Sequence, residues 1–186
     1  MSLGELAAKL AGRVAQPPGD LTRDRAAVAV LLAPAPDSVL LIQRAERAGD
    51  RWSGQLALPG GRVSPLDPDL AATARRETLE EVGIDLAGAT LLGALDDLEP
   101  RTPVLPPILV RPFVFSLAEQ TPPRPNQEVA GVWWVPLSAF LVEGIYGPVE
   151  YRRYGTLART MGYHLEQGVL WGLTERILTP LLRSMS

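Results

Sequence analysis

The chain has 186 residues, of which 46% are hydrophobic and 21% are charged, and it carries a net charge of -3. This composition is typical of a folded globular domain and excludes a chain that is disordered throughout. The mildly negative charge provides no basic stripe, so binding to nucleic acid is not expected. The sequence has no cysteine and a single histidine, His164, which excludes disulfides and metal sites built from thiolates or several histidines. A metal site must then use oxygen ligands, which favour Mg²⁺, Mn²⁺ or Ca²⁺.

The first residues are expected to form an amphipathic helix over 3–15, because charged side chains recur among apolar ones. This pattern differs from that of a signal peptide, and the chain has no apolar run of about 18 residues or more. We therefore expect no membrane insertion and a cytoplasmic location. Whether the helix packs on its own domain or on a second subunit stays open, so a homodimer is one alternative. The segment 1–19 is expected to be a helix and linker within one domain that covers 1–186.

Short apolar runs separated by proline-rich loops predict strands in the remainder of the chain. The expected strands cover 26–32, 39–43, 55–58, 90–95, 108–115 and 128–135, and the expected helices cover 70–82 and 171–182. Asp69 is placed to cap the start of the central helix, and Gly83 is placed to end it. Several strands around one central helix favour a single domain of the α/β (α+β) class.

The most informative segment is RRETLEEVGI, residues 75–84. Glu77, Glu80 and Glu81 are three and four residues apart, so a helix places their carboxylates on one side. Like charges at this spacing destabilise a helix by about 0.2–0.5 kcal/mol per pair, and a divalent cation would turn that repulsion into binding. Arg76 can pair with Glu80 and orient the acids. For the acids alone, a solvent-exposed helix face is the alternative interpretation.

A glycine pair precedes this helix in LPGGR, residues 58–62. A strand that ends in two glycines exposes its backbone, so the carbonyl groups there can approach a metal ion or a phosphate. The order of strand, glycine loop, acidic helix and terminal glycine within one short segment therefore favours a metal-dependent phosphate chemistry over a plain acidic surface.

With these residues in place, the segment 59–84 resembles the signature of the Nudix hydrolases. That signature is a glycine, five residues, Glu, seven residues and then Arg-Glu-aliphatic-x-Glu-Glu-x-Gly-aliphatic; here its second half is 76–84 and its first half begins at Gly61. Two positions depart from it. Thr78 replaces a bulky aliphatic residue, and one extra residue between the halves puts the first acid, Asp67, out of register. Asp67 is expected to support the loop rather than to bind metal.

The resemblance implies an α/β/α sandwich with a mixed β-sheet and a central catalytic loop and helix. It also implies hydrolysis of a nucleoside diphosphate linked to another group, with water as nucleophile and Mg²⁺ or Mn²⁺ as cofactor. The family's metal ligands fall on Glu77, Glu80, Glu81 and the carbonyl group of Gly60. A further acid near Glu128 often serves as metal ligand or base, the alternative being an exposed strand glutamate. Which carboxylate is the base is left open.

The segment 41–61 resembles the region before the signature in the coenzyme A pyrophosphatase branch of the family. The matching residues are Arg44-Ala45, Gly54 and Leu58-Pro59-Gly60-Gly61, and 91–115 and 169–178 resemble the same branch. Coenzyme A or an acyl-coenzyme A is therefore the first candidate substrate. ADP-ribose, dinucleotides, nucleoside triphosphates and a role as a non-catalytic nucleotide-binding module are the alternatives.

Three arginines that flank the proposed site are candidates for contacts with substrate phosphates: Arg44, Arg62 and Arg111. Arginine suits this role because its guanidinium group donates two hydrogen bonds in parallel, although a surface arginine is the plain alternative for each. His164 is expected to be a structural or surface residue.

Overall fold

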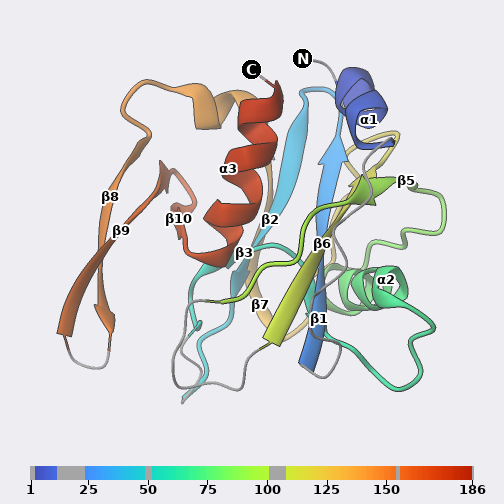
Figure 1. The fold of residues 1–186 in the computed structure, drawn as a ribbon, viewed down its shortest axis with the longest axis horizontal. Coiled ribbons are helices and arrows are strands. Elements are labelled where there is room, and N and C mark those ends of the chain that lie inside the picture. The colour runs from blue at the N-terminus through green and yellow to red at the C-terminus, as the bar shows by residue number, and fades with distance from the viewer. Residues whose placement is uncertain (1–2, 12–23, 49–51, 101–107, 154–155, 186) are drawn as a thin grey trace.

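The computed structural model describes residues 3–11, 24–48, 52–100, 108–153 and 156–185 (Figure 1). Its helices are α1 (Leu3–Ala11), α2 (Leu70–Val82) and α3 (Leu173–Met185), with a short 3₁₀ turn, η1, at Leu137–Leu141. Its strands are β1 (Asp24–Ala33), β2 (Ser38–Arg44), β3 (Leu56–Ala57), β4 (Gly60–Arg62), β5 (Thr90–Ala94), β6 (Ile108–Ser116), β7 (Val129–Pro136), β8 (Tyr146–Arg153), β9 (Thr156–Leu165) and β10 (Gly168–Trp171). Within these ranges, no helix is long and apolar enough to cross a membrane.

Seven strands form a mixed sheet with β1 at its centre. The main path is β3-β2-β1-β6-β5, with β7 beside β2 and β4 beside β1. The pairing of β1 with β6 is parallel, whereas its pairings with β2 and β4 are antiparallel. The position of β1 therefore determines where β4, which carries the glycine pair, meets the rest of the molecule.

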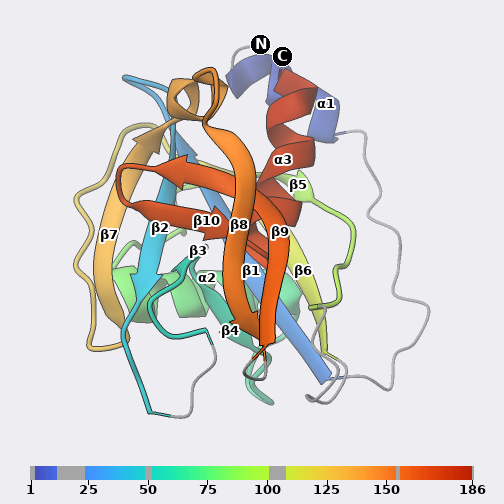
Figure 2. The same ribbon diagram turned by 90° about the vertical axis from the view of Figure 1, so that its left-hand side faces the viewer.

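Helices cover both faces of this sheet. Successive side chains of β1 point to opposite faces. Val30 and Leu32 pack in the apolar cluster that includes α1 and α3, whereas Ala29 and Leu31 pack in the cluster that includes α2. Figure 2 shows the β8–β9 hairpin in front of the sheet and α2 behind it. The predicted sandwich of helices around a mixed sheet is confirmed.

The first helix packs on its own chain. Leu6 and Leu10 are buried in the same apolar cluster as Ile177 of α3. Of the helix expected over 3–15, the structure contains α1, and 12–15 lie outside the described residues.

The last part of the chain departs from the expected elements. The strands β8, β9 and β10 form a three-stranded antiparallel sheet that was not predicted. The prediction of a helix from Trp171 was wrong at its start. Trp171 belongs to β10, where it pairs with Gly162 of β9, and Gly172, at a left-handed φ of 73°, turns the chain before Leu173. A short apolar run such as 169–171 fits a strand or a helix equally well, so its pattern does not place the boundary.

Candidate active site

Two glycines allow β4 to lie between β1 and α2. Gly60 and Gly61 pair with Val28 and Ala27 of β1, so the expected open loop is in fact a short strand. A Cβ atom on Gly60, where φ is 155°, would lie 2.3 Å from the carbonyl oxygen of Ala27, and a Cβ on Gly61 would lie 2.4 Å from the carboxyl carbon of Glu77. Because both positions lack a side chain, the backbone of β4 can lie directly against the acidic face of α2.

Glu81 is the most buried acid of this face. It is 4% exposed, and its Oε2 accepts a hydrogen bond of 2.9 Å from the backbone N–H of Gly60. Burial raises the pKa of Glu81 to about 7, the Gly60 N–H opposes that shift, and the negative charge of Glu77 adds to it. The protein therefore holds, beside its glycine strand, a carboxyl group whose negative charge is poorly solvated and would be stabilised by a cation.

The pKa of Glu81 predicts how stability depends on pH when no divalent cation is present. The unfolded chain loses this proton near pH 4.5 and the folded chain near pH 7, so the free energy of unfolding falls as pH rises between these values. Glu81→Gln cannot titrate, so its stability relative to the wild type should increase across the interval by up to about 3 kcal/mol. Urea unfolding of both proteins in EDTA at pH 5, 6, 7 and 8 measures this. Parallel stability curves would show that Glu81 titrates normally.

The other predicted acids surround Glu81. Burial raises the pKa of Glu77, the Arg76 side chain opposes that rise, and the charges on Glu80 and Glu128 add to it. Glu128 acts on Glu81 in the same direction. The structure thus gathers all four acids, although Glu77 and Glu81 are at least partly buried while the side chains of Glu80 and Glu128 are about half exposed.

Backbone contacts determine the position of Glu128, which directly precedes β7. The N–H of Asn126 donates to the carbonyl oxygen of Glu81 (2.9 Å), and the N–H of Glu128 donates to the side-chain oxygen of Asn126 (2.7 Å). The carbonyl oxygen of Glu128 accepts from the N–H of Ala45, just after β2 (2.8 Å). Glu128 is therefore tied both to α2 and to the end of β2.

Arg76 links the acids to the loop before α2. Its Nε and Nη2 donate to the two carboxylate oxygens of Asp67, both at 2.9 Å, while its Nη1 donates to Glu77 (2.8 Å) and Glu80 (3.1 Å). Asp67 also accepts from the N–H of Ser64 and the hydroxyl of Thr73. These contacts, led by the bond to Arg76, hold the pKa of Asp67 well below its usual range. Asp67 thus supports the loop, as expected, despite its displaced register.

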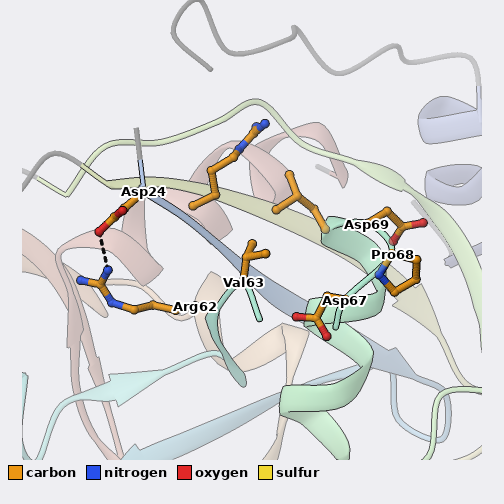
Figure 3. Close-up of a pocket in the computed structure, with 8 residues that line it drawn as sticks. Asp24, Arg62, Val63, Asp67, Pro68 and Asp69 are labelled. Atoms are coloured by element: carbon orange, nitrogen blue, oxygen red, sulfur yellow. Dashed lines mark hydrogen bonds and ion pairs between the residues drawn. The ribbon is translucent and has the colours of Figure 1, made fainter. Parts of the chain in front are cut away.

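Removal of the Asp67 carboxylate should destabilise the protein. Its side chain is 5% exposed and Arg76 would keep a charge without this partner, so Asp67→Ala should lower the free energy of unfolding by about 2–3 kcal/mol. Asp24→Ala is the control, because Asp24 binds Arg62 at 2.7 Å on the surface (Figure 3), where an ion pair contributes about 0–1 kcal/mol. Urea unfolding compares the two. Equal losses would contradict the supporting role of Asp67.

The second departure from the signature, Thr78, is explained by a local hydrogen bond. Thr78 is fully buried, and its hydroxyl donates to the carbonyl oxygen of Ala74 one turn earlier (2.7 Å). The polar atom is thus satisfied within the helix, so threonine can occupy a position that usually holds an aliphatic side chain.

The three predicted phosphate contacts lie in different surroundings. Arg44 ends β2, and its charge lowers the pKa of Glu81. Arg62 lines a pocket of about 480 Å³ at the start of β1 and α2 (Figure 3). Arg111 binds both carboxylate oxygens of Asp97, at 2.6 and 3.1 Å. Of the three, Arg44 thus acts on an acid of the site, Glu81, and the role of all three in substrate binding stays a prediction.

One residue next to the acids was missed by sequence reasoning. The Nη2 of Arg47 donates to the Oε1 of Glu128 at 3.0 Å. The two residues are 81 positions apart and Arg47 lies in a polar segment without regular spacing, so no sequence signal could have found the pair. His164, as expected, is exposed, and its Nε2 bonds the carbonyl oxygen of Pro148 on the hairpin at 3.2 Å.

The donor set of the site suits a hard divalent cation, because it consists of carboxylate and backbone oxygen atoms. In the described part of the chain, no group of three acidic or histidine side chains is arranged to hold a metal ion. Arg76 bonds both Glu77 and Glu80, so these side chains must turn before they can share a cation with Glu81. Glu77, Glu80 and Glu81 are the residues that could hold it.

Comparisons with known proteins point to one family. The model of the NUDIX domain matches residues 22–152. The Nudix hydrolase NudL of Yersinia pestis (strain Pestoides F) is 32% identical over 166 residues, which cover 89% of this chain and 81% of that protein. Protein C14C4.10c of Schizosaccharomyces pombe is 46% identical over 109 residues, 56% of this chain but only 33% of its own length.

A solved structure shows the same fold. The MutT/nudix family protein from Enterococcus faecalis superposes with a TM-score of 0.57 and 19% identity, covering 96% of this chain and 67% of the other. The matched family model includes the glycine strand, the acidic helix and Glu128. Members of that family are hydrolases of nucleoside diphosphate derivatives and generally depend on a divalent metal. The chain belongs to the Nudix hydrolase family.

Proposed function

We propose that this chain hydrolyses the diphosphate linkage of a nucleoside diphosphate derivative with Mg²⁺ or Mn²⁺ held by Glu77, Glu80, Glu81 and the carbonyl group of Gly60. The observation that carries the proposal is the buried Glu81 carboxyl group on the N–H of Gly60, with Glu77 beside it. Such a site concentrates negative charge where a cation would relieve it.

The proposed reaction assigns a separate role to each group of the site. A bound divalent cation supplies neutralisation of the diphosphate and a lower pKa for an attacking water. One carboxylate of the acidic cluster accepts the proton of the water, and we propose Glu81 or Glu128 for that step. Arg76, fixed by Asp67, orients Glu77 and Glu80. The new P–O bond to water forms as the anhydride P–O bond breaks, which leaves two phosphorylated products.

Coenzyme A or an acyl-coenzyme A is the substrate class that we propose first. The segment that resembles the coenzyme A pyrophosphatase branch, 41–61, begins in β2 and ends in β4. Its residues at the end of β2 lie close to the acids, since Ala45 bonds the backbone of Glu128 and the charge of Arg44 acts on Glu81. Arg62 and Arg111 are proposed as further phosphate contacts, and the protein is proposed to act in the cytoplasm as one domain.

The test is a substrate panel with mass detection of products. Coenzyme A, ADP-ribose, dinucleotides and nucleoside triphosphates are each incubated with Mg²⁺ and with Mn²⁺. Coenzyme A should yield adenosine 3′,5′-bisphosphate and 4′-phosphopantetheine. Preferential cleavage of another compound would make that compound the proposed substrate. If no compound is cleaved, the proposed hydrolase function is refuted. Thermal stabilisation by a panel member without cleavage would favour a nucleotide-binding module.

A further inference from the structure

Hydrogen bonds join the two described arms of the segment after β2, residues 44–48 and 52–55. The N–H of Arg44 donates to the carbonyl oxygen of Gln55 (3.1 Å), and the N–H of Gly54 donates back to the carbonyl oxygen of Arg44 (3.0 Å). Further along, the hydroxyl of Ser53 accepts from the N–H of Arg47 (2.9 Å) and donates to its carbonyl oxygen (3.1 Å). The backbone of Arg47 is therefore held in place by Ser53.

The side chain of Arg47 is directed at the candidate site. Its guanidinium group bonds Glu128 at 3.0 Å, and the two side chains are about half exposed, at 49% and 47%. A guanidinium group carries five N–H donors, and this contact uses one of them. An exposed ion pair of this kind contributes about 0–1 kcal/mol, so stability does not explain the placement.

Each acid of the site lies close to an arginine. Arg76 bonds Glu77 and Glu80, Arg44 acts on Glu81, and Arg47 bonds Glu128. A divalent cation among the four carboxylates would weaken the attraction of each acid for its arginine, since part of the negative charge would already be neutralised. Arg47 is the most exposed of these three arginines. Its side chain can therefore turn to a new anion at the lowest cost in free energy.

We propose that Arg47 is a substrate-binding residue that exchanges the carboxylate of Glu128 for a phosphate oxygen of the diphosphate. This inference rests on the proposed function. Phosphate suits the guanidinium group because two parallel N–H bonds can form, whereas the bond to Glu128 is single. The exchange would also leave Glu128 available to the cation or to the attacking water, so metal and substrate would favour each other's binding.

The test measures binding separately from turnover. Calorimetry gives the affinity for Mn²⁺ alone and then, with Mn²⁺ present, the affinity for α,β-methylene-ADP, a diphosphate that cannot be hydrolysed at its bridge. Arg47→Ala should bind Mn²⁺ as tightly as the wild type or more tightly, because Glu128 loses a competing cation. It should bind the analogue about tenfold more weakly, which corresponds to a loss of about 1.4 kcal/mol in binding free energy. Arg47→Lys keeps the charge without the planar fork and should lie between.

Arg159→Ala is the matched control, because Arg159 makes a similar exposed ion pair with Glu150 on the hairpin, at 2.7 Å. It should leave both affinities unchanged. Unchanged analogue affinity in Arg47→Ala, equal weakening of Mn²⁺ and analogue, or absence of analogue binding by the wild type would each overturn the assignment. Hydrolysis of the panel by the wild type is followed in parallel. Its absence refutes the proposed function, whereas an active wild type with an unaffected Arg47→Ala variant refutes Arg47 alone.

Discussion

Glu81→Gln should reduce kcat on the best substrate by a factor on the order of 1,000. Loss of a residue that only supports a metal ligand costs about 10- to 100-fold, and removal of the ligand's own charge should cost more. The variant should nevertheless fold, because the amide oxygen of glutamine can still accept from the N–H of Gly60. It should also be at least as stable as the wild type at pH 8 without metal, since a buried negative charge has been removed.

This combination of results separates chemistry from folding. Activity is measured with saturating Mg²⁺ and with Mn²⁺. Thermal unfolding is measured at pH 8 on metal-free samples in EDTA, because bound metal would add to the stability of the wild type. Glu150→Gln is the control, because Glu150 is exposed on the hairpin and binds Arg159; it should retain wild-type kcat. A fully active Glu81→Gln variant would refute the metal placement, and a strongly destabilised one would refute the account of its burial.

Gly61→Ala should lower kcat about 100-fold with little change in stability. The backbone of Gly61 does not lie in the left-handed region, so alanine fits its conformation, but its Cβ would come within 2.4–2.6 Å of the carboxyl group of Glu77. That group is the end of a flexible side chain, so it can move away at small cost. A displacement of about 1 Å at a reacting centre is enough to cost about 100-fold in rate.

Gly88→Ala provides the comparison, because nothing lies within 4 Å of a Cβ at that position. Its kcat and its unfolding temperature should stay close to those of the wild type. For Gly61→Ala, kcat and the affinity for Mn²⁺ should fall together, because Glu77 is one of the proposed ligands. A variant that retains full activity would show that the position of Glu77 is not critical.

The acidic helix could be predicted from the sequence because every local signal agrees there. Asp69 caps its first turn by accepting from the N–H of Ala72, and Gly83 ends it at a left-handed φ of 67°. Helical spacing also placed Glu77, Glu80 and Glu81 on one side. It could not show that Glu81 is buried and Glu80 exposed, because that difference depends on where β4 crosses the helix.

Contacts between segments that are far apart in the sequence could not be predicted. The pair of Arg47 and Glu128 joins two loops, and the backbone bond of Asn126 to Glu81 ties the loop of Glu128 to the helix. Neither pair has a spacing that a helix or strand would impose. The β8–β10 sheet was missed for a related reason, since its strands are stabilised mainly by one another and by packing against α3.

The way Asp67 holds its loop has a consequence for how such proteins are recognised from sequence. The loop between Gly61 and α2 is anchored through the side chain of Asp67, which reaches Arg76 on the helix. A side-chain anchor tolerates an inserted residue, because the loop can bulge outward while both ends stay in place. Within α2, an insertion would instead rotate the later acids by about 100° around the helix axis. Searches with a rigid spacing across the loop would therefore reject functional chains, whereas rigid spacing within the helix is physically justified.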